Sequence, residues 1–205
     1  MRKARLAVCL ALLGALVMAC GEDREDKEEA KGEAMAKHVA AASPATLASP
    51  PAWEAKLLAE LPALGHRNWV VVADAAFPLQ ISPGMEVVVS NEGHFVVLEK
   101  VLKALDASKH VRPKVYLDKE LAFVPEAFAP GVDACRARLK AMLAGRDVKP
   151  VLHEELIARM DQVAKMFRIL MIKTNLTVPY TTVFMELDCG YWGSDGEAAM
   201  RKSMK

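Results

Sequence analysis

The chain has 205 residues, of which 53% are hydrophobic and 26% are charged. Its 27 basic and 26 acidic residues nearly cancel, so no bulk basic field favours nucleic acid, and we expect no nucleic-acid partner. Aromatic residues make up 6% and repeats are few, which excludes fibrous and low-complexity proteins. The sequence divides into a leader (1–19), a tether (20–52), one folded domain (53–192) and a C-terminal tail (193–205).

The leader has the features of a secretory signal peptide. Three basic residues at positions 2–5 precede the uncharged run 6–18, which is too short to span a bilayer, since a span takes about 20 residues. The run ends in Val-Met-Ala-Cys at positions 17–20, which resembles a bacterial lipobox and predicts a lipidated Cys20. An ordinary signal peptide or a short buried helix is the alternative. Removing the three basic residues of the leader changes the net charge from +1 to −2.

Lipidation of Cys20 predicts an exported bacterial lipoprotein whose acyl chains bind it to a membrane. Gly21 stands where an Asp usually retains such proteins in the inner membrane, so we expect outer-membrane attachment on the periplasmic side in a double-membrane organism. Residues 21–52 mix both charge signs with Ala, Gly, Ser and Pro, which predicts a solvated tether. In the domain, Cys135 and Cys189 show no spacing motif; we expect buried thiols, with a disulfide as the alternative.

From residue 53 onward, helix and strand patterns alternate. The continuous apolar run 69–73 is typical of a strand buried on both faces. Helical spacing after Pro50-Pro51 places five apolar residues on one predicted face: Trp53, Leu57, Leu58, Leu61 and Leu64. The predicted helices cover 53–64, 95–105, 134–143 and 153–166, and the predicted strands cover 69–73, 85–89, 114–117, 168–172 and 183–187. Strands separated by helices predict an α/β fold, a three-layer sandwich with a mostly parallel sheet.

Ligands of parallel sheets bind at the carboxyl ends of the strands, which directs attention to three segments. These are 65–78 around the first strand, the region of His153, and 174–182 between the last two strands. Two other histidines, His94 and His110, are predicted at solvated helix edges.

Taken alone, the polar residues of these segments also permit structural roles. His66 fits a strand entry, Asp74 a turn before Pro78, and Tyr180 a loop aromatic packed on the core. The aromatic pair Tyr191-Trp192 fits either stacking on a sugar or a subunit contact.

The order of these motifs resembles one known family. Gly65-His66, the apolar strand after it, and Asp74-Ala75 followed by Pro78 resemble the opening motif of the D-ribose pyranase / L-fucose mutarotase family. Tyr180 and the strand that follows it resemble the Tyr-x-Asn segment of that family, with Thr182 in place of the Asn. Residues 173–176 replace an Arg/Thr-Gly-Glu turn and carry no carboxylate. The resemblance covers roughly residues 53–192 and indicates a divergent, exported branch of a mostly cytosolic family.

The resemblance implies mutarotation, the opening and reclosing of the hemiacetal ring of a free monosaccharide, without a cofactor and without a metal. Histidine suits this proton transfer because its reference pKa is about 6.5. By resemblance, catalysis falls to His66 with its partner Asp74 and to His153 and Tyr180, and sugar binding to Lys173 and Thr182. Because family members form rings in which the Tyr segment lines a neighbour's site, we also expect a homo-oligomer. The alternatives are a non-catalytic sugar-binding lipoprotein and a structural lipoprotein with a vestigial pocket.

Overall fold

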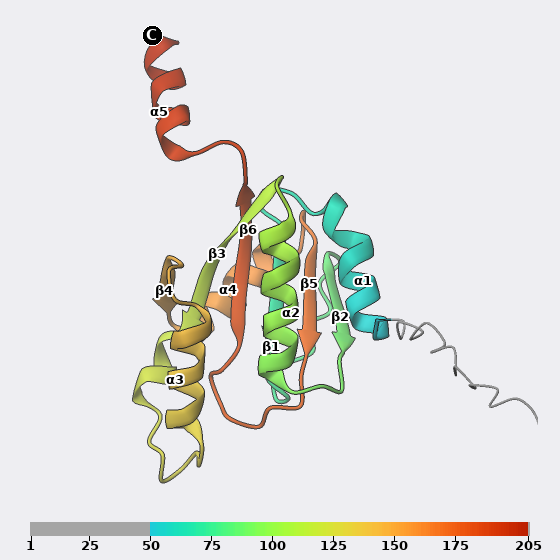
Figure 1. The fold of residues 1–205 in the computed structure, drawn as a ribbon, viewed down its shortest axis with the longest axis vertical. Helices are drawn as coiled ribbons and strands as arrows, with labels where there is room; N and C mark the ends of the chain where they lie inside the picture. The colour runs from blue at the N-terminus through green and yellow to red at the C-terminus, as the bar shows by residue number, and fades with distance from the viewer. Residues whose placement is uncertain (1–49, 205) are drawn as a thin grey trace, which may run out of the picture. The chain divides into compact units, whose positions relative to one another are not determined.

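A computed structural model describes residues 50–204; the predicted leader, Cys20 and nearly all of the tether lie outside the described residues. One six-stranded sheet has the order β2-β5-β1-β6-β3-β4 (Figure 1). β6 is antiparallel to its neighbours β1 and β3, whereas the other three pairings are parallel, so the predicted, mostly parallel sheet is confirmed. The strands are β1 (Trp69–Ala73), β2 (Met85–Val89), β3 (Val111–Asp118), β4 (Val148–Val151), β5 (Ile169–Lys173) and β6 (Val183–Cys189).

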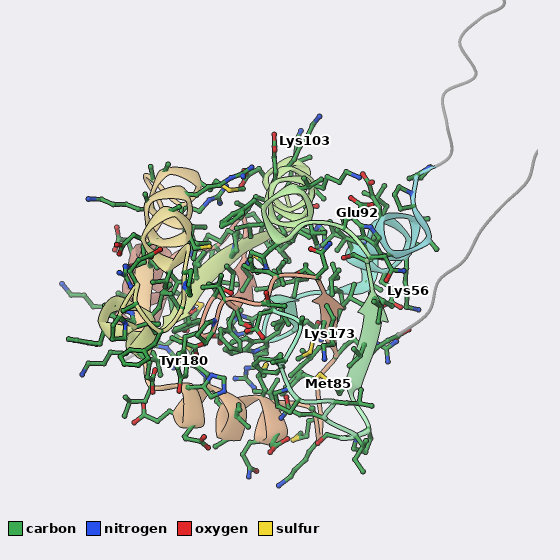
Figure 2. The ribbon with its side chains drawn as sticks, turned by 90° about the horizontal axis from the view of Figure 1, so that it is seen from below. Lys56, Met85, Glu92, Lys103, Lys173 and Tyr180 are labelled. Atoms are coloured by element: carbon green, nitrogen blue, oxygen red, sulfur yellow. The ribbon has the colours of Figure 1, made fainter. Side chains whose placement is uncertain are left out.

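Helices cover both faces of the sheet, which makes the predicted three-layer α/β sandwich. One core joins α1 (Ala52–Glu60), α2 (His94–Ala107) and α3 (Val132–Met142) to alternate strand residues such as Val70 and Val72. On the other face, Val71 and its strand neighbours pack against α4 (His153–Val163). Figure 2 shows α4 on one side of the sheet and α1, α2 and α3 on the other. Every residue of β1 is buried because both of its faces are covered.

The first predicted helix is shorter than its apolar spacing suggests. α1 ends at Glu60, and a 3₁₀ turn covers Leu61–Ala63, where Pro62 lacks the N–H that continued α-helix would need. Leu57 is fully buried, but Leu58 is 49% exposed, so its predicted place on the buried face is wrong. Adjacent helical residues lie about 100° apart around the axis, and only one of the two leucines can point at the sheet.

Two elements have no counterpart among the predicted ones. β4 has four residues, carries Pro150 and lies at the sheet edge, where a residue without an N–H is tolerated. The C-terminal tail forms α5 (Ser194–Ser203), a polar helix without any buried residue. Neither segment has the apolar periodicity by which strands and helices are predicted. A further short 3₁₀ helix, η2 (Lys119–Phe123), follows β3.

Close backbone contacts require a glycine at position 84, directly before the edge strand β2. A Cβ at Gly84 would lie 2.2 Å from the carbonyl oxygen of Phe167 and 2.5 Å from that of Ala164. The Gly84 N–H donates to the Ala164 carbonyl at 2.7 Å, so the end of α4 and the start of β2 meet directly through their backbones. Glycine is required there because any side chain would push the two segments apart.

Both domain cysteines are free thiols. Cys135 is buried as expected, whereas Cys189 is partly exposed, so its expected burial is wrong. Within residues 50–204, no helix combines the length and the apolar character needed to cross a membrane.

Candidate functional site

The candidate site lies at the end of the sheet that carries the carboxyl ends of the parallel strands. The register pairs Ala73 with Lys173, and it pairs Val183 with both Val72 and Leu117, so the ends of β1, β3 and β5 meet the start of β6. The residues just beyond these strand ends therefore share one edge. Figure 2 views the molecule from this edge and labels Tyr180 and Lys173. This is the location that the rule for ligand sites in parallel sheets predicts.

Asp74 occupies the end of β1 and is held in one orientation. Its Oδ2 accepts a hydrogen bond from the Thr182 hydroxyl at 2.9 Å, and its Oδ1 accepts one from the Ala76 N–H at 3.0 Å. The Asp74 N–H donates to the same Thr182 hydroxyl at 3.2 Å. Thr182 is fully buried, so its hydroxyl fixes the Asp74 carboxylate from behind; direct contact of Thr182 with a sugar stays a prediction.

His153 begins α4 and is oriented by two carboxylates. Its Nδ1 lies 3.1 Å from Oδ1 of Asp118, the last residue of β3. Its backbone N–H donates to both carboxylate oxygens of Glu120 at 3.1 Å. Glu120 thus satisfies a free N–H at the helix start, where negative charge is favourable.

Asp118 is a buried acid with an unusual ionisation. Burial raises the pKa of Asp118 to about 6, against the hydrogen bond and charge of His153, which lower it. The negative charges of Glu120 and Asp74 raise it further. The pKa of this carboxyl group therefore approaches the range in which acid–base catalysis at neutral pH operates.

Aromatic rings enclose the His153 imidazole. The Tyr180 ring lies 5.4 Å from it, centroid to centroid, at 87°, and the Phe77 ring lies 5.8 Å away at 76°. Tyr180 has a φ of 58°, a left-handed conformation that is uncommon for a bulky residue and is found where a loop is held under constraint. The loop 174–182 thus brings a phenol against the imidazole.

A cavity of about 280 Å³ opens beside Asp74. Its walls are residues 74–76 after β1 and residues 177–179 of the loop before β6. This volume is at the lower end for ligand sites and suits a small polar molecule.

Lys173 ends β5 at the same edge. Its Nζ donates to the backbone carbonyl of Phe77 at 2.7 Å, which ties the strand to the segment after β1. An ammonium group has three donors, so two remain for other partners. Binding of a sugar by Lys173 stays a prediction.

His94 lies next to Thr174, just after the end of β5. The prediction that His94 is solvated is wrong. It is only 2% exposed, and its Nδ1 lies 3.0 Å from the hydroxyl of Thr174, which donates to the Ala73 carbonyl at 2.8 Å. Burial lowers the pKa of His94 to about 4, against the charge of Asp74, which raises it. His94 is therefore neutral at pH 7 and supports the start of the loop 174–182 by packing and hydrogen bonding. His110, also predicted as solvated, is half-buried, and its Nε2 contacts the carbonyl oxygens of Leu61 and Leu64.

His66 lies at the opposite end of β1. The strand runs from Trp69 to Ala73, a length of roughly 13 Å, and separates His66 from Asp74. Within this chain the structure therefore does not bring His66 to the cluster of Asp74, His153 and Tyr180.

At its own end of the sheet, His66 contacts another carboxylate. Its Nδ1 lies 3.0 Å from Oδ1 of Asp188, which also pairs with Arg112 at 3.2 Å and Lys114 at 3.1 Å. Burial opposes ionisation of Asp188, but Lys114 and Arg112 outweigh it and lower the pKa of Asp188 to about 2. These four side chains line a cavity of about 640 Å³. Trp192 lines the same cavity and is 45% exposed.

Two residues around His153 escaped the sequence analysis, namely Asp118 and Glu120, and the sequence analysis placed His94 in solvent rather than behind the site. Asp118 carried a usable signal, because it directly follows the predicted strand 114–117, at a carboxyl end where ligands bind. No signal in the sequence predicts its contact with His153, because that contact depends on the pairing of β3 with β4.

A search of curated proteins found no match. Among solved structures, RbsD of Bacillus subtilis, complexed with D-ribose, is 20% identical with a TM-score of 0.46, covering 65% of this chain and 89% of its own. The fucose mutarotase of Streptococcus pneumoniae, in complex with L-fucose, is 15% identical with a TM-score of 0.47, covering 69% and 98%. FucU of Bifidobacterium longum is 17% identical with a TM-score of 0.43, covering 68% and 95%.

The family assignment comes from a family model rather than from these structures. The model of the RbsD / FucU transport protein family matches residues 49–189, which include every described strand and all described helices but α5. The chain belongs to the RbsD / FucU transport protein family.

Proposed function

We propose that this protein is a monosaccharide mutarotase, which opens and recloses the ring of a free sugar by acid–base catalysis. The observation that carries the proposal is that the His153 imidazole lies against the Tyr180 ring and Asp118, at the end of the sheet where Asp74 lines a small cavity and is close enough for its charge to act on Asp118. Family membership supports the same reading, as does the resemblance of the motifs around Asp74 and Tyr180 to those of sugar mutarotases.

The reaction requires two coordinated proton transfers. One group takes the proton of the anomeric hydroxyl while the bond between the anomeric carbon and the ring oxygen breaks, and another gives a proton to that oxygen. The product is an open-chain carbonyl compound, which rotates and closes with the transfers reversed. The imidazole of His153 and the phenol of Tyr180, which lie against each other, and the carboxylate of Asp74 beside the cavity are groups that can carry these protons.

Exchange spectroscopy by NMR tests the proposal. Wild-type chain should speed the exchange between sugar anomers in a panel of ribose, fucose, galactose and glucose. General acid–base catalysis contributes about 10²–10⁴-fold, enough to be measured for a reaction that already proceeds in water. A rate equal to that of buffer for every sugar contradicts catalysis.

A non-catalytic sugar-binding protein is the second candidate. Thr182 replaces the family's Asn and is bound to Asp74, and residues 173–176 provide no carboxylate. Both features reduce the number of groups that reach a sugar. Calorimetric binding of a sugar without faster exchange selects this function, and absence of binding with normal folding selects a structural protein with a vestigial pocket.

We also propose a homo-oligomer in which His66 of a second copy completes the site. His66 is exposed, with 54% of its side chain accessible, and lies at the end of β1 opposite Asp74. A partner's histidine reaches the cluster only across an interface. Light scattering should therefore report an oligomer, and mixing inactive His66→Ala and His153→Ala chains should restore part of the exchange rate. A monomer, or no restoration after subunit exchange, contradicts a shared site.

We propose further that the chain is a lipoprotein anchored through Cys20, exported and held at the outer membrane on the periplasmic side. The support is the short apolar run and the Val-Met-Ala-Cys sequence at its end. In bacteria fed a palmitate analogue, the wild-type chain should carry label and sediment with membranes. Cys20→Ser should lose both properties, and a labelled or membrane-bound Cys20→Ser chain contradicts the anchor.

A further inference from the structure

His153 has more restraints than a surface histidine at a helix start needs. Its Nδ1 contacts Asp118, its backbone N–H is bound by Glu120, and the rings of Phe77 and Tyr180 lie edge-on to it. Its side chain is 22% exposed, whereas the side chain of Asp118 is completely buried. The carboxylate is thus on the inner side of the imidazole, and the accessible part of the ring faces outward.

No structural role accounts for the Asp118 side chain. It stands at the N-cap position of η2 but makes no capping hydrogen bond there. Its Oδ2 is buried and finds no hydrogen-bond partner among residues 50–204. Burying an acid with one oxygen unpaired costs free energy, so the contact with His153 is the only described interaction that explains a carboxyl group at this position.

We propose that Asp118 is a positioning residue, which holds His153 as the tautomer with the proton on Nδ1 and leaves Nε2 free to exchange protons with the substrate. This inference rests on the proposed function and deepens it. An ionised carboxylate can only accept hydrogen bonds, so the ring nitrogen next to it must carry the hydrogen. The same contact makes the remaining nitrogen a better base, as carboxylate partners of histidines do elsewhere.

The charges around Asp118 agree with this assignment. Glu120 and Asp74 are the negative groups that act on it, and the imidazole of His153 is its only hydrogen-bond partner among the described residues. The two acidic neighbours favour an imidazole that keeps its Nδ1 proton beside Asp118. Burial raises the pKa of Asp118, but to a value that still leaves the group mostly ionised at pH 7.5.

The tautomer of His153 can be read directly by ¹⁵N NMR of the imidazole in wild-type chain at pH 7.5. The expected result is a protonated Nδ1 and an unprotonated Nε2. A protonated Nε2 in the wild type overturns the proposal without any variant. This measurement reads the position of the ring proton and does not depend on catalysis, so a protein that binds sugar without catalysing exchange still gives a decisive answer.

The variant Asp118→Asn then tests the consequence for catalysis. Its amide can donate to Nδ1, so the proton of the ring should move to Nε2 in part or completely. The rate of anomer exchange at saturating sugar should fall by about 10–100-fold, as after loss of a carboxylate behind a functional histidine. The sugar concentration giving half of the maximal rate should change little, because Asp118 does not line the accessible face.

Asp106→Asn is the matched control. It removes the same charge from an exposed aspartate that pairs with Arg146. It should keep the wild-type tautomer and rate. If Asp118→Asn folds and keeps both, the positioning role is wrong. If Asp118→Asn does not fold, the ¹⁵N NMR measurement of the His153 tautomer in the wild type alone decides whether Asp118 has the positioning role.

Discussion

Replacing His153 with glutamine is expected to slow catalysed anomer exchange by about 10²–10⁴-fold. Glutamine preserves a polar side chain of similar reach but cannot take up or release a proton near neutral pH. The loss should be large because His153 contacts the phenol of Tyr180 and is held by Asp118. NMR exchange spectroscopy at saturating sugar measures the rate.

His110→Gln is the matched control for this substitution. His110 lies away from the cluster, with its Nε2 near the carbonyl oxygens of Leu61 and Leu64. It should retain the wild-type exchange rate once circular dichroism shows that both variants are folded. A His153→Gln chain that exchanges sugar as fast as the wild type removes His153 from the mechanism.

Acid should destabilise the wild type through His94. Burial lowers the pKa of this histidine to about 4 in the folded chain, whereas its ordinary value is 6.5. Between these values the unfolded chain binds a proton that the folded chain does not, so stability is present above pH 6.5 and is lost as the pH falls through 4. The full difference is on the order of 3 kcal/mol of unfolding free energy.

Urea unfolding followed by tryptophan fluorescence at pH 7, 5.5 and 4 tests this dependence. His94→Gln does not titrate, so its free energy of unfolding should fall less between pH 7 and pH 4 than that of the wild type. Val97→Ala on the same helix is the control, because it removes buried apolar atoms without changing ionisation. Its curve should run below that of the wild type and parallel to it. Parallel curves for His94→Gln and the wild type would refute the assignment.

Local patterns were enough to predict most of the sheet. The run 69–73 matches β1, because a strand buried by helices on both faces shows as an apolar segment. The run 85–89 matches β2, a partly exposed edge strand that is still rich in β-branched residues. The predicted strand 114–117 lies inside the longer β3, which also includes the buried Val111, the exposed Arg112, Pro113 and the buried acid Asp118. Pairing with a neighbour, rather than composition, determines where a strand ends.

The position of His66 shows where local reasoning stops. The seven residues between His66 and Asp74 include the predicted strand 69–73, and an extended strand places its two ends far apart. The motif that runs from His66 to Asp74 is therefore divided between the two ends of strand β1. The proposed interface with a second copy would bring these two polar residues together, so the oligomeric state tests the role of His66.

By itself, the sequence determined the class of fold, the family motifs and the segments that carry polar side chains beyond strand ends. The tertiary structure alone decided which of those side chains meet. Asp118 reaches His153 because β3 and β4 pair in parallel over residues far apart in the chain, and Thr182 reaches Asp74 because β6 enters beside β1. Apolar periodicity is a local property of the chain, whereas these contacts depend on long-range strand pairing that leaves no local trace.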